Sequence, residues 1–156
     1  MKMGRPSEIS AQDADPTPTR RQYGALCWRK GEAGIEVLLI TSRDTGRWII
    51  PKGWPMTGVK PENAAAREAW EEAGVEGVVS PVSIGGYGYL KDLEPTVVVP
   101  CTVSVYGLRV KDMAKKFPER AERQRQWFRP DEAASLVREP DLAALIRGFA
   151  PLGDRG

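Results

Sequence analysis

One stretch of helical character lies between two sets of strand-like segments, and this order limits the folds open to the chain. From Glu62 the pattern is helical, with alanines spaced four residues apart, and Pro61 and Gly74 stand at its two ends. Proline suits the first turn of a helix, and glycine suits its end. The sequence therefore predicts one central helix over residues 62–74.

Strand-like segments precede and follow this helix. A glycine-bearing hairpin connection joins two strands before it, and a short third strand stops at a proline, after which a constrained loop follows. These segments are 23–29, 35–42 and 47–51, with the loop at 51–61. After the helix come a strand broken by glycines, a long buried strand, a short strand and two short helices. These later segments are 75–90, 96–110, 126–128, 131–137 and 141–150. Such an order predicts an α/β (α+β) fold with α/β/α layers.

The chain is long enough for one domain, with tails at both ends. Residues 1–19 carry almost no large apolar side chains, so they are predicted to form a disordered N-terminal tail. The domain itself is expected over 20–150, with a short C-terminal tail at 151–156. We find no signal-peptide pattern and no apolar run of membrane-spanning length, and we expect a cytoplasmic protein.

Composition excludes several kinds of chemistry. The 156 residues include no histidine, which removes serine–histidine triads and histidine–zinc sites from consideration. The net charge of +2 does not predict binding to nucleic acid or to a membrane. Cys27 and Cys101 lie in apolar runs and are predicted to be buried free thiols. Any acid–base or metal chemistry must therefore rest on carboxylates, lysines, tyrosines or cysteines.

Residues 67–75 read REAWEEAGV and concentrate carboxylates on the predicted helix. Glu68 and Glu72 are four residues apart and share a helical face, and Glu71 adjoins them. Like charges at this spacing repel, so either solvent screens them or a cation neutralises them. The rigid loop upstream favours a cation, because Gly53 lets backbone approach a ligand closely. Carboxylate and carbonyl oxygens are the ligands that Mg²⁺ prefers, usually together with substrate phosphates.

Gly53 and the run 67–75 resemble the Nudix box, G-x5-E-x7-R-E-U-x-E-E-x-G-U. The spacing agrees throughout, and the fixed residues agree except at the first glutamate, where this chain has Val59. The resemblance implies a Nudix-type α/β/α sandwich with a mixed sheet. It also implies a hydrolase that cleaves pyrophosphate bonds with Mg²⁺ (or Mn²⁺).

Roles follow from the resemblance residue by residue. Glu68, Glu72 and the Gly53 carbonyl are expected to bind the metal. Glu71 is expected to deprotonate the attacking water, with Glu68 as the alternative, and Arg67 to orient the glutamates. A further carboxylate in this family often comes from a downstream loop, and the candidates for it here are Glu119 and Glu122.

Charge is unevenly distributed along the chain. Residues 20–60 carry eight basic against three acidic side chains, and residues 111–130 carry seven against three. Residues 61–76 carry one against five. Basic stretches around an acidic metal helix suit a highly phosphorylated ligand, although scattered surface charge would give the same counts.

The chain is also similar, over roughly residues 20 to 150, to the diphosphoinositol polyphosphate phosphohydrolase branch of this family. Substrate-binding residues implied by that similarity are Arg20, Arg21, Ser42, Arg43, Lys91 and Arg123. The chain departs from the branch in the loop PKGWPMTG and near Glu139, where the branch has a basic residue.

The substrate remains open between a diphosphoinositol polyphosphate and a dinucleoside polyphosphate. Trp28, Trp54 and Tyr87 are candidates to stack an adenine or to pack in loops and core. The alternatives are a nucleotide-sugar or damaged-nucleotide pyrophosphatase, and a catalytically silent module that binds a nucleotide or polyphosphate. We expect a small-molecule partner, no nucleic acid, no membrane, and a monomer or homodimer.

Overall fold

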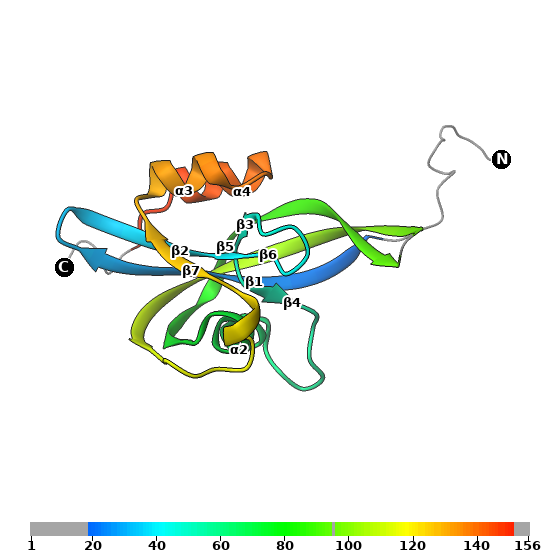
Figure 1. Cartoon of the computed structure of the whole chain (residues 1–156), viewed down its shortest axis with the longest axis horizontal. Helices are drawn as coiled ribbons and strands as arrows, with labels where there is room; N and C mark the ends of the chain where they lie inside the picture. The colour runs from blue at the N-terminus through cyan, green and yellow to red at the C-terminus, as the bar shows by residue number, and fades with distance from the viewer. Residues whose placement is uncertain (1–18, 95, 152–156) are drawn as a thin grey trace.

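The computed structural model describes residues 19–94 and 96–151, and it shows a sheet with helices on both faces (Figure 1). The tails expected at 1–19 and 151–156 lie almost entirely outside these described ranges. Seven strands of the described chain form the sheet. They are β1 (Arg20–Gly31), β2 (Gly34–Thr41), β3 (Trp48–Ile49), β4 (Lys52–Gly53), β5 (Val75–Glu94), β6 (Val97–Met113) and β7 (Arg125–Phe128).

Three α-helices of the described ranges flank the sheet. One face carries α2 (Pro61–Ala73), and the other carries α3 (Pro130–Leu136) and α4 (Pro140–Arg147) (Figure 1). Each face has its own apolar core, because successive side chains of a strand point to opposite faces. Leu26 of β1 packs in the core under α3 and α4, whereas the neighbouring Cys27 packs in the core under α2. The α/β/α layering expected from the sequence is confirmed.

The strands pair as a mixed sheet. The main path runs β3-β2-β1-β6-β5, while β4 pairs with β1 and β7 pairs with β2. β1 and β6 are parallel, whereas the β1–β2 and β5–β6 pairs are antiparallel. A parallel pair requires a long crossover, and here the chain between β1 and β6 includes α2. This topology brings α2 against the centre of the sheet.

The predicted central helix begins and ends close to the expected residues. Pro61 is the first residue of α2, and Gly74 caps its other end in the left-handed conformation (φ 67°). The Gly74 N–H donates to the carbonyl of Trp70 at 2.9 Å, which satisfies an otherwise open helix end. The buried face of the helix consists largely of alanines, so its backbone packs closely on the sheet. Its glutamates therefore stand at a defined position relative to the strands.

Two segments differ from the sequence expectation. The loop predicted at 51–61 contains the short strand β4, in which Gly53 pairs with Tyr23 of β1. The strand predicted to be broken at its glycines is one continuous strand, β5, with bulges near Gly77 and Gly85. Glycine has a weak preference for strands, and pairing along the length of β6 compensates for it. Sequence patterns alone do not reveal this pairing.

The two cysteines lie inside the fold. Cys27 and Cys101 are both free and buried, as predicted. Burial raises the pKa of the Cys27 thiol to about 12. Among the helices that the structure describes, none is long and apolar enough to cross a membrane.

Candidate active site

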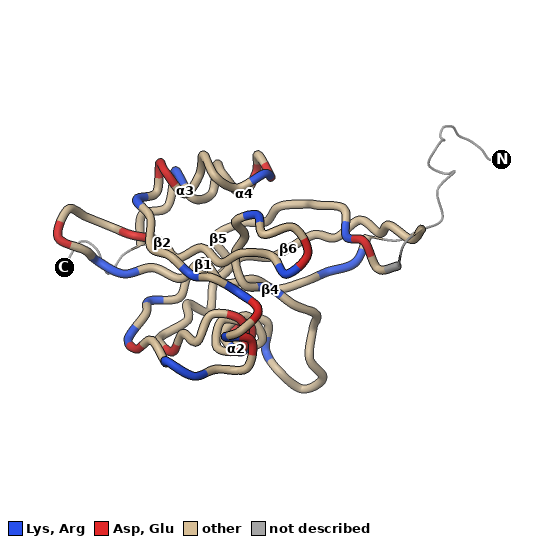
Figure 2. The backbone as a smooth tube through the Cα atoms, in the orientation of Figure 1, with Lys and Arg blue, Asp and Glu red and all other residues tan. Residues whose placement is uncertain are grey.

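A cavity of about 400 Å³ with mainly polar walls lies beside α2. Its walls come from the loop after β2, from β4, from α2, from the end of β5 and from the chain around the short 3₁₀ helix η1 (Arg120–Glu122). Acidic positions gather on α2, and basic positions lie along the neighbouring strands and loops (Figure 2). We call this space the polar cavity; its walls include Ser42, Arg43, Lys52, Gly53, Glu68, Glu72, Lys91, Glu119, Arg123 and Arg138.

Two carboxyl groups of α2 line the polar cavity together. Glu68 and Glu72 stand one helical turn apart, and Glu72 is buried, with 7% of its surface exposed. β4 lies directly against them, since the Lys52 N–H donates to Glu72 Oε1 at 3.3 Å. A side chain at Gly53 would overlap the Glu68 carboxyl group. Glycine is therefore needed at position 53 for the backbone to approach Glu68 this closely.

This arrangement disfavours the charged forms of both carboxyl groups. Burial raises the pKa of Glu68 to about 8, and the hydrogen bond and charge of Glu72 add to the effect. Burial also raises the pKa of Glu72, against the opposing charge of Arg123. Two adjacent carboxyl groups tend to share one proton. A cation bound between them would relieve the same repulsion.

The donor set fits a hard divalent cation. Mg²⁺ is usually bound by one or two carboxylates together with water and substrate phosphates. Glu68 and Glu72 supply two carboxylates, and the Gly53 backbone lies against them. Over residues 19–94 and 96–151, no three Asp, Glu, Cys or His side chains form a group that could hold a metal ion. Two carboxylates, backbone oxygen and ligands from solvent or substrate would therefore make up the coordination shell.

Arg123 is the main counter-charge of the buried carboxylates. Its Nε donates to Glu119 Oε1 at 2.8 Å and its Nη1 donates to the Thr41 carbonyl at 3.0 Å. Its Nη2 lies 3.8 Å from Glu72 Oε2, and only 7% of the side chain is exposed. The residue predicted to bind phosphate thus lines the polar cavity with its guanidinium already engaged by protein groups.

Of the two candidates for an additional carboxylate, only Glu119 lines the polar cavity. Glu122 instead accepts a hydrogen bond from Arg43 Nη1 at 3.1 Å. Val59, which replaces the first glutamate of the family pattern, lies in the loop before α2, where its N–H donates to the Met56 carbonyl at 3.0 Å. Val59 is not among the residues that line the polar cavity.

Four of the six predicted substrate-binding residues line the polar cavity, and the other two do not. Those present are Ser42, Arg43, Lys91 and Arg123. Arg20 and Arg21 lie at the exposed start of β1, where Arg21 Nη1 donates to Ser104 Oγ at 2.7 Å. The next residue of the strand, Gln22, does line the cavity, because side chains alternate between the two faces of a strand.

Glu71 and Arg67 are also absent from the residues that line the polar cavity. Glu71 directly precedes Glu72, and successive residues of an α-helix are rotated by about 100°, so Glu71 lies to the side of the face that Glu68 and Glu72 turn toward the cavity. Arg67 is exposed, and its Nη1 lies 3.5 Å from Met56 Sδ. The hydrogen bonds expected from Arg67 to the glutamates are not among those of the described chain.

Lys52 is a cavity residue that the sequence did not single out. Its ammonium lies 5.0 Å from the centroid of the Tyr89 ring. Burial lowers the pKa of Lys52 to about 8, although the charge of Glu72 opposes this. Its position next to Gly53, in a loop expected to approach a ligand, is the sequence feature that could have identified Lys52 as a cavity residue. A half-buried cation beside two carboxylates suits the binding of a bridging phosphate.

Arg138 is a second residue that was missed. It lines the polar cavity one position before Glu139, near where the related branch was expected to carry a basic residue. Glu139 is buried and pairs with Arg47 Nη2 at 2.8 Å. The departure noted at Glu139 therefore has a basic residue beside it, since Arg138 lines the cavity one position earlier in the chain.

The candidate aromatic residues separate into two kinds. Trp28 and Tyr87 are buried in the core beneath α3 and α4, with 5% and 3% of their surfaces exposed. Trp54 is exposed and lines the polar cavity, and the Lys91 ammonium lies 5.9 Å from the centroid of its ring. Among the three, only Trp54 lines the polar cavity.

Comparisons with known proteins extend this description. The model of the NUDIX domain matches residues 18–149. The chain is 34% identical over 119 residues to Nudix hydrolase 16, mitochondrial, of Arabidopsis thaliana, covering 74% of this chain and 66% of that protein. It is 31% identical over 126 residues to diphosphoinositol polyphosphate phosphohydrolase 3-beta of Homo sapiens, covering 79% and 72% respectively.

A solved structure of C. elegans Ap4A hydrolase is similar in fold. It superposes with a TM-score of 0.60 at 19% identity, covering 83% of this chain and 95% of that one. The chain spans just under two thirds of the Arabidopsis relative, so the activity of that whole protein is not carried over here. The domain match over most of the chain, and the human relative of comparable length, show that the chain belongs to the Nudix hydrolase family.

Proposed function

We propose that this protein hydrolyses a pyrophosphate bond in a highly phosphorylated small molecule, in a reaction that depends on Mg²⁺ or Mn²⁺. The observation that carries the proposal is the pair of Glu68 and Glu72 carboxyl groups held against Gly53 in a cavity with basic walls. A bound divalent cation would supply Lewis acidity toward the phosphoryl oxygens and the attacking water. Glu68, Glu72 and the Gly53 carbonyl are the groups proposed to hold it.

The chain's own residues have distinct proposed tasks in the reaction. The oxygen of a water molecule forms the new bond to phosphorus, and the bridging oxygen leaves with the other phosphoryl group. The proton of that water goes to a carboxylate, for which the sequence favoured Glu71 with Glu68 as the alternative. The position of Glu68 in the cavity wall supports Glu68, since a general base must be within hydrogen-bond reach of the proton it removes.

Basic walls support a substrate with several phosphate groups. Arg43 and Lys91 line the cavity, and Lys52 and Arg138 add two further cations. Charge-assisted hydrogen bonds to phosphate are stronger than neutral ones. The human relative is a diphosphoinositol polyphosphate phosphohydrolase and the C. elegans structure is that of an Ap4A hydrolase, which supports the same two substrate classes, diphosphoinositol polyphosphates and dinucleoside polyphosphates.

Trp54 favours a second candidate, the dinucleoside polyphosphates, because an exposed indole at the cavity can stack on an adenine. A nucleotide-sugar substrate would need fewer of the cations. A silent binding module would have no use for two carboxyl groups whose charged forms are disfavoured in the unliganded fold. The cytoplasmic location expected from the sequence stays a prediction.

A substrate panel tests this proposal. Purified protein would be incubated with diphosphoinositol pentakisphosphate, diadenosine hexaphosphate, ADP-ribose and a nucleoside triphosphate, with Mg²⁺ or Mn²⁺, and the products quantified by ion-exchange chromatography. We expect the first two to be cleaved most efficiently. Glu72→Gln should lower kcat by at least about 100-fold, since even indirect supports of metal ligands contribute 10- to 100-fold.

Matched controls separate the site from general effects. Glu76→Gln, at an exposed position on β5, removes the same charge and should leave turnover unchanged. Binding of these compounds without any product from any of them would instead establish the silent-module alternative. Preferential cleavage of ADP-ribose would replace the polyphosphate assignment with the nucleotide-sugar one.

A further inference from the structure

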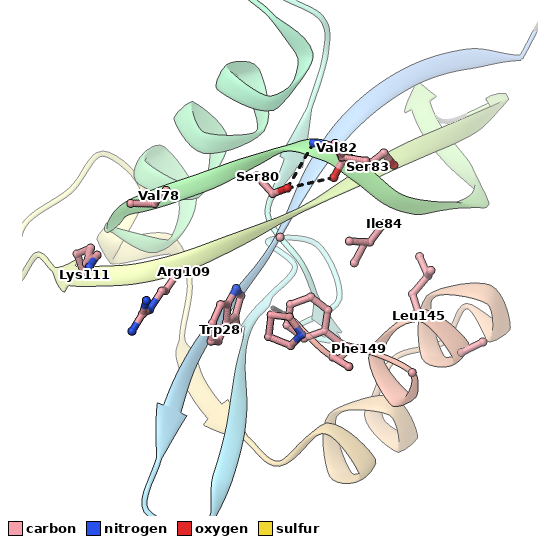
Figure 3. A pocket seen from close by; sticks show the side chains of 15 residues that line it. Trp28, Val78, Ser80, Val82, Ser83, Ile84, Arg109, Lys111, Leu145 and Phe149 are labelled. Atoms are coloured by element: carbon pink, nitrogen blue, oxygen red, sulfur yellow. Dashed lines mark hydrogen bonds between the residues drawn. The ribbon is translucent and has the colours of Figure 1, made fainter. Parts of the chain in front are cut away.

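A second, apolar hollow of about 740 Å³ lies between β5, β6 and α4. Its walls include Trp28, Val78, Val82, Ile84, Leu145 and Phe149, and we call this space the apolar hollow (Figure 3). Small-molecule sites typically have volumes of about 300–1,000 Å³ and predominantly apolar walls. The apolar hollow shares no lining residue with the polar cavity. Its contents would therefore not touch the proposed catalytic groups.

A bulge in β5 produces the hollow. Val79 pairs with Leu108 of β6, and the next paired residue, Ser83, faces Tyr106. Three residues of β5 thus stand opposite the single residue Gly107, which has no side chain to fill the space. A hydroxyl group of the bulge stabilises it, since Ser83 Oγ donates to the Val105 carbonyl at 3.1 Å. Hydrogen bonding within the sheet keeps the space open.

The rim of the apolar hollow leaves apolar surface uncovered, above a floor that two packed aromatic rings form. The ring centroids of Trp28 and Phe149 lie 5.9 Å apart with an edge-to-face inclination. On the rim, Val78 and Val82 have 60% and 70% of their surfaces exposed. Leaving such side chains in water forgoes stabilisation that burial would supply. An occupant with an apolar body would recover it.

Only one end of the hollow is charged. Arg109 and Lys111 stand beside Val78, whereas Ile84 and Leu145 lie toward the other end (Figure 3). The Arg109 guanidinium lies 5.7 Å from the centroid of the Trp28 ring. Within the part of the chain that the structure describes, neither cation pairs with a carboxylate. Two cations at one end of an apolar space suit an anion attached to an apolar body.

We propose that the apolar hollow binds a small single-chain carboxylic acid. The hydrocarbon chain would cover Val78, Val82 and the half-buried Phe149. The carboxylate would lie beside Arg109 and Lys111. This site goes beyond the proposed hydrolase function and does not depend on it. The charge at one end favours such an amphiphile over a neutral apolar compound, and the concave shape favours a small molecule over a flat protein surface.

Calorimetric titration of the full chain with decanoate tests the proposal. We expect one decanoate bound per chain, and decanol, which lacks the charge, bound about tenfold more weakly, because two exposed ion pairs of up to about 1 kcal/mol each would be lost. Arg109→Gln combined with Lys111→Gln should weaken decanoate binding by a similar factor. The matched control, Lys115→Gln combined with Lys116→Gln, removes the same charge at exposed positions outside the hollow and should bind normally.

A blocking variant provides the second arm. Ala144 is exposed on α4 at the wall of the hollow, so Ala144→Trp fills the space without disturbing the core. This variant should lose decanoate binding and keep its pyrophosphate hydrolysis and its melting temperature. Undiminished binding by Ala144→Trp, or equal binding by the two double variants, would overturn the proposal. So would a wild-type dimer that Ala144→Trp dissociates in sedimentation, because a second copy would then be the occupant.

Discussion

The polar cavity and the apolar hollow are both open spaces on one small sheet, yet their charges are arranged in opposite ways. In the polar cavity Glu68 and Glu72 oppose each other, and buried Arg123 compensates them only in part. In the apolar hollow Arg109 and Lys111 stand at one exposed end, and neither pairs with a carboxylate among the residues that the structure describes. The polar cavity therefore holds unfavourable electrostatic energy that a ligand can release, whereas the hollow holds only uncovered apolar surface.

The repulsion between Glu68 and Glu72 in the polar cavity lowers the stability of the metal-free fold. Proteins often tolerate strained or repelling groups at functional sites because the rest of the fold stabilises them. Changes in the polar cavity should thus alter folding, metal binding and turnover together. Changes at the hollow should alter only the binding of its occupant.

The largest effect on stability is expected for Arg123→Met. This change leaves Glu72 and Glu119 without their buried counter-charge, and breaking a buried pair from one side costs about 3–5 kcal/mol. We expect a loss of about 3 kcal/mol in the free energy of unfolding, measured by urea denaturation in the presence of a chelator.

A double variant shows whether electrostatics causes this loss. Arg123→Met combined with Glu72→Gln removes both members of the pair and should be more stable than Arg123→Met alone by about 1 kcal/mol or more. Equal stabilities of the single and double variants would mean that Arg123 acts through packing. Arg120→Gln, at an exposed position of η1, serves as the matched control and should change little.

The pH dependence of stability should be smaller but specific. The pKa of Glu68 is raised to about 8 in the fold from an ordinary value of 4.5, so the unfolded chain releases its proton first. Without metal, stability should fall as the pH rises from about 4.5 to about 8 and then level off, by linkage. The lowered pKa of Lys52, also about 8, acts only above this window, where it raises stability with pH.

Urea denaturation at pH 5, 6.5 and 8 in chelator measures this slope. Glu68→Gln should flatten it, and Glu32→Gln, at an exposed hairpin position, should not. Adding Mn²⁺ at pH 8 should restore the stability of the wild-type protein. If Glu68→Gln left the change of stability with pH unaltered, repulsion between the two carboxyl groups would not be the cause of that change.

Substrate recognition at the exposed wall of the polar cavity should give the smallest effects. The Arg43 side chain is 56% exposed, and it is shared with Glu122, so each contact with phosphate is screened by solvent. Arg43→Gln combined with Lys91→Gln should raise KM several-fold for a diphosphoinositol polyphosphate, with less effect on ADP-ribose, in steady-state kinetics. The same increase for both substrates would argue against a polyphosphate subsite.

The sequence could predict the parts of the site that lie along one element. Glu68 and Glu72 share a face because of helical periodicity, and Gly53 was identifiable because a loop glycine permits close approach. The α/β/α layers followed from the order of strands and helices. These predictions depend on local geometry, which spacing in the sequence describes well.

Other residues required the tertiary structure. Arg138 reaches the polar cavity from the chain between α3 and α4, and no spacing relates it to α2. Lys52 stands beside Gly53, but only the tertiary structure shows that Lys52 lines the cavity. Arg21 lies on the opposite face of β1 from Gln22. Which side chains of a strand turn to which face of the sheet depends on the register of the strand with its neighbours. The apolar hollow depends on a bulge opposite Gly107, which follows from how β5 and β6 pair. Long-range pairing is the information that one sequence does not contain.

Metal binding at the paired carboxyl groups is the central claim, and Mn²⁺ titration followed by electron paramagnetic resonance tests it without any substrate. We predict that the wild-type protein binds Mn²⁺ and that Glu72→Gln and Glu68→Gln each weaken binding by at least about tenfold. Glu76→Gln should bind like the wild type. Mn²⁺ bound with unchanged affinity by Glu72→Gln and Glu68→Gln would contradict the assignment of the polar cavity as a metal-dependent hydrolytic site.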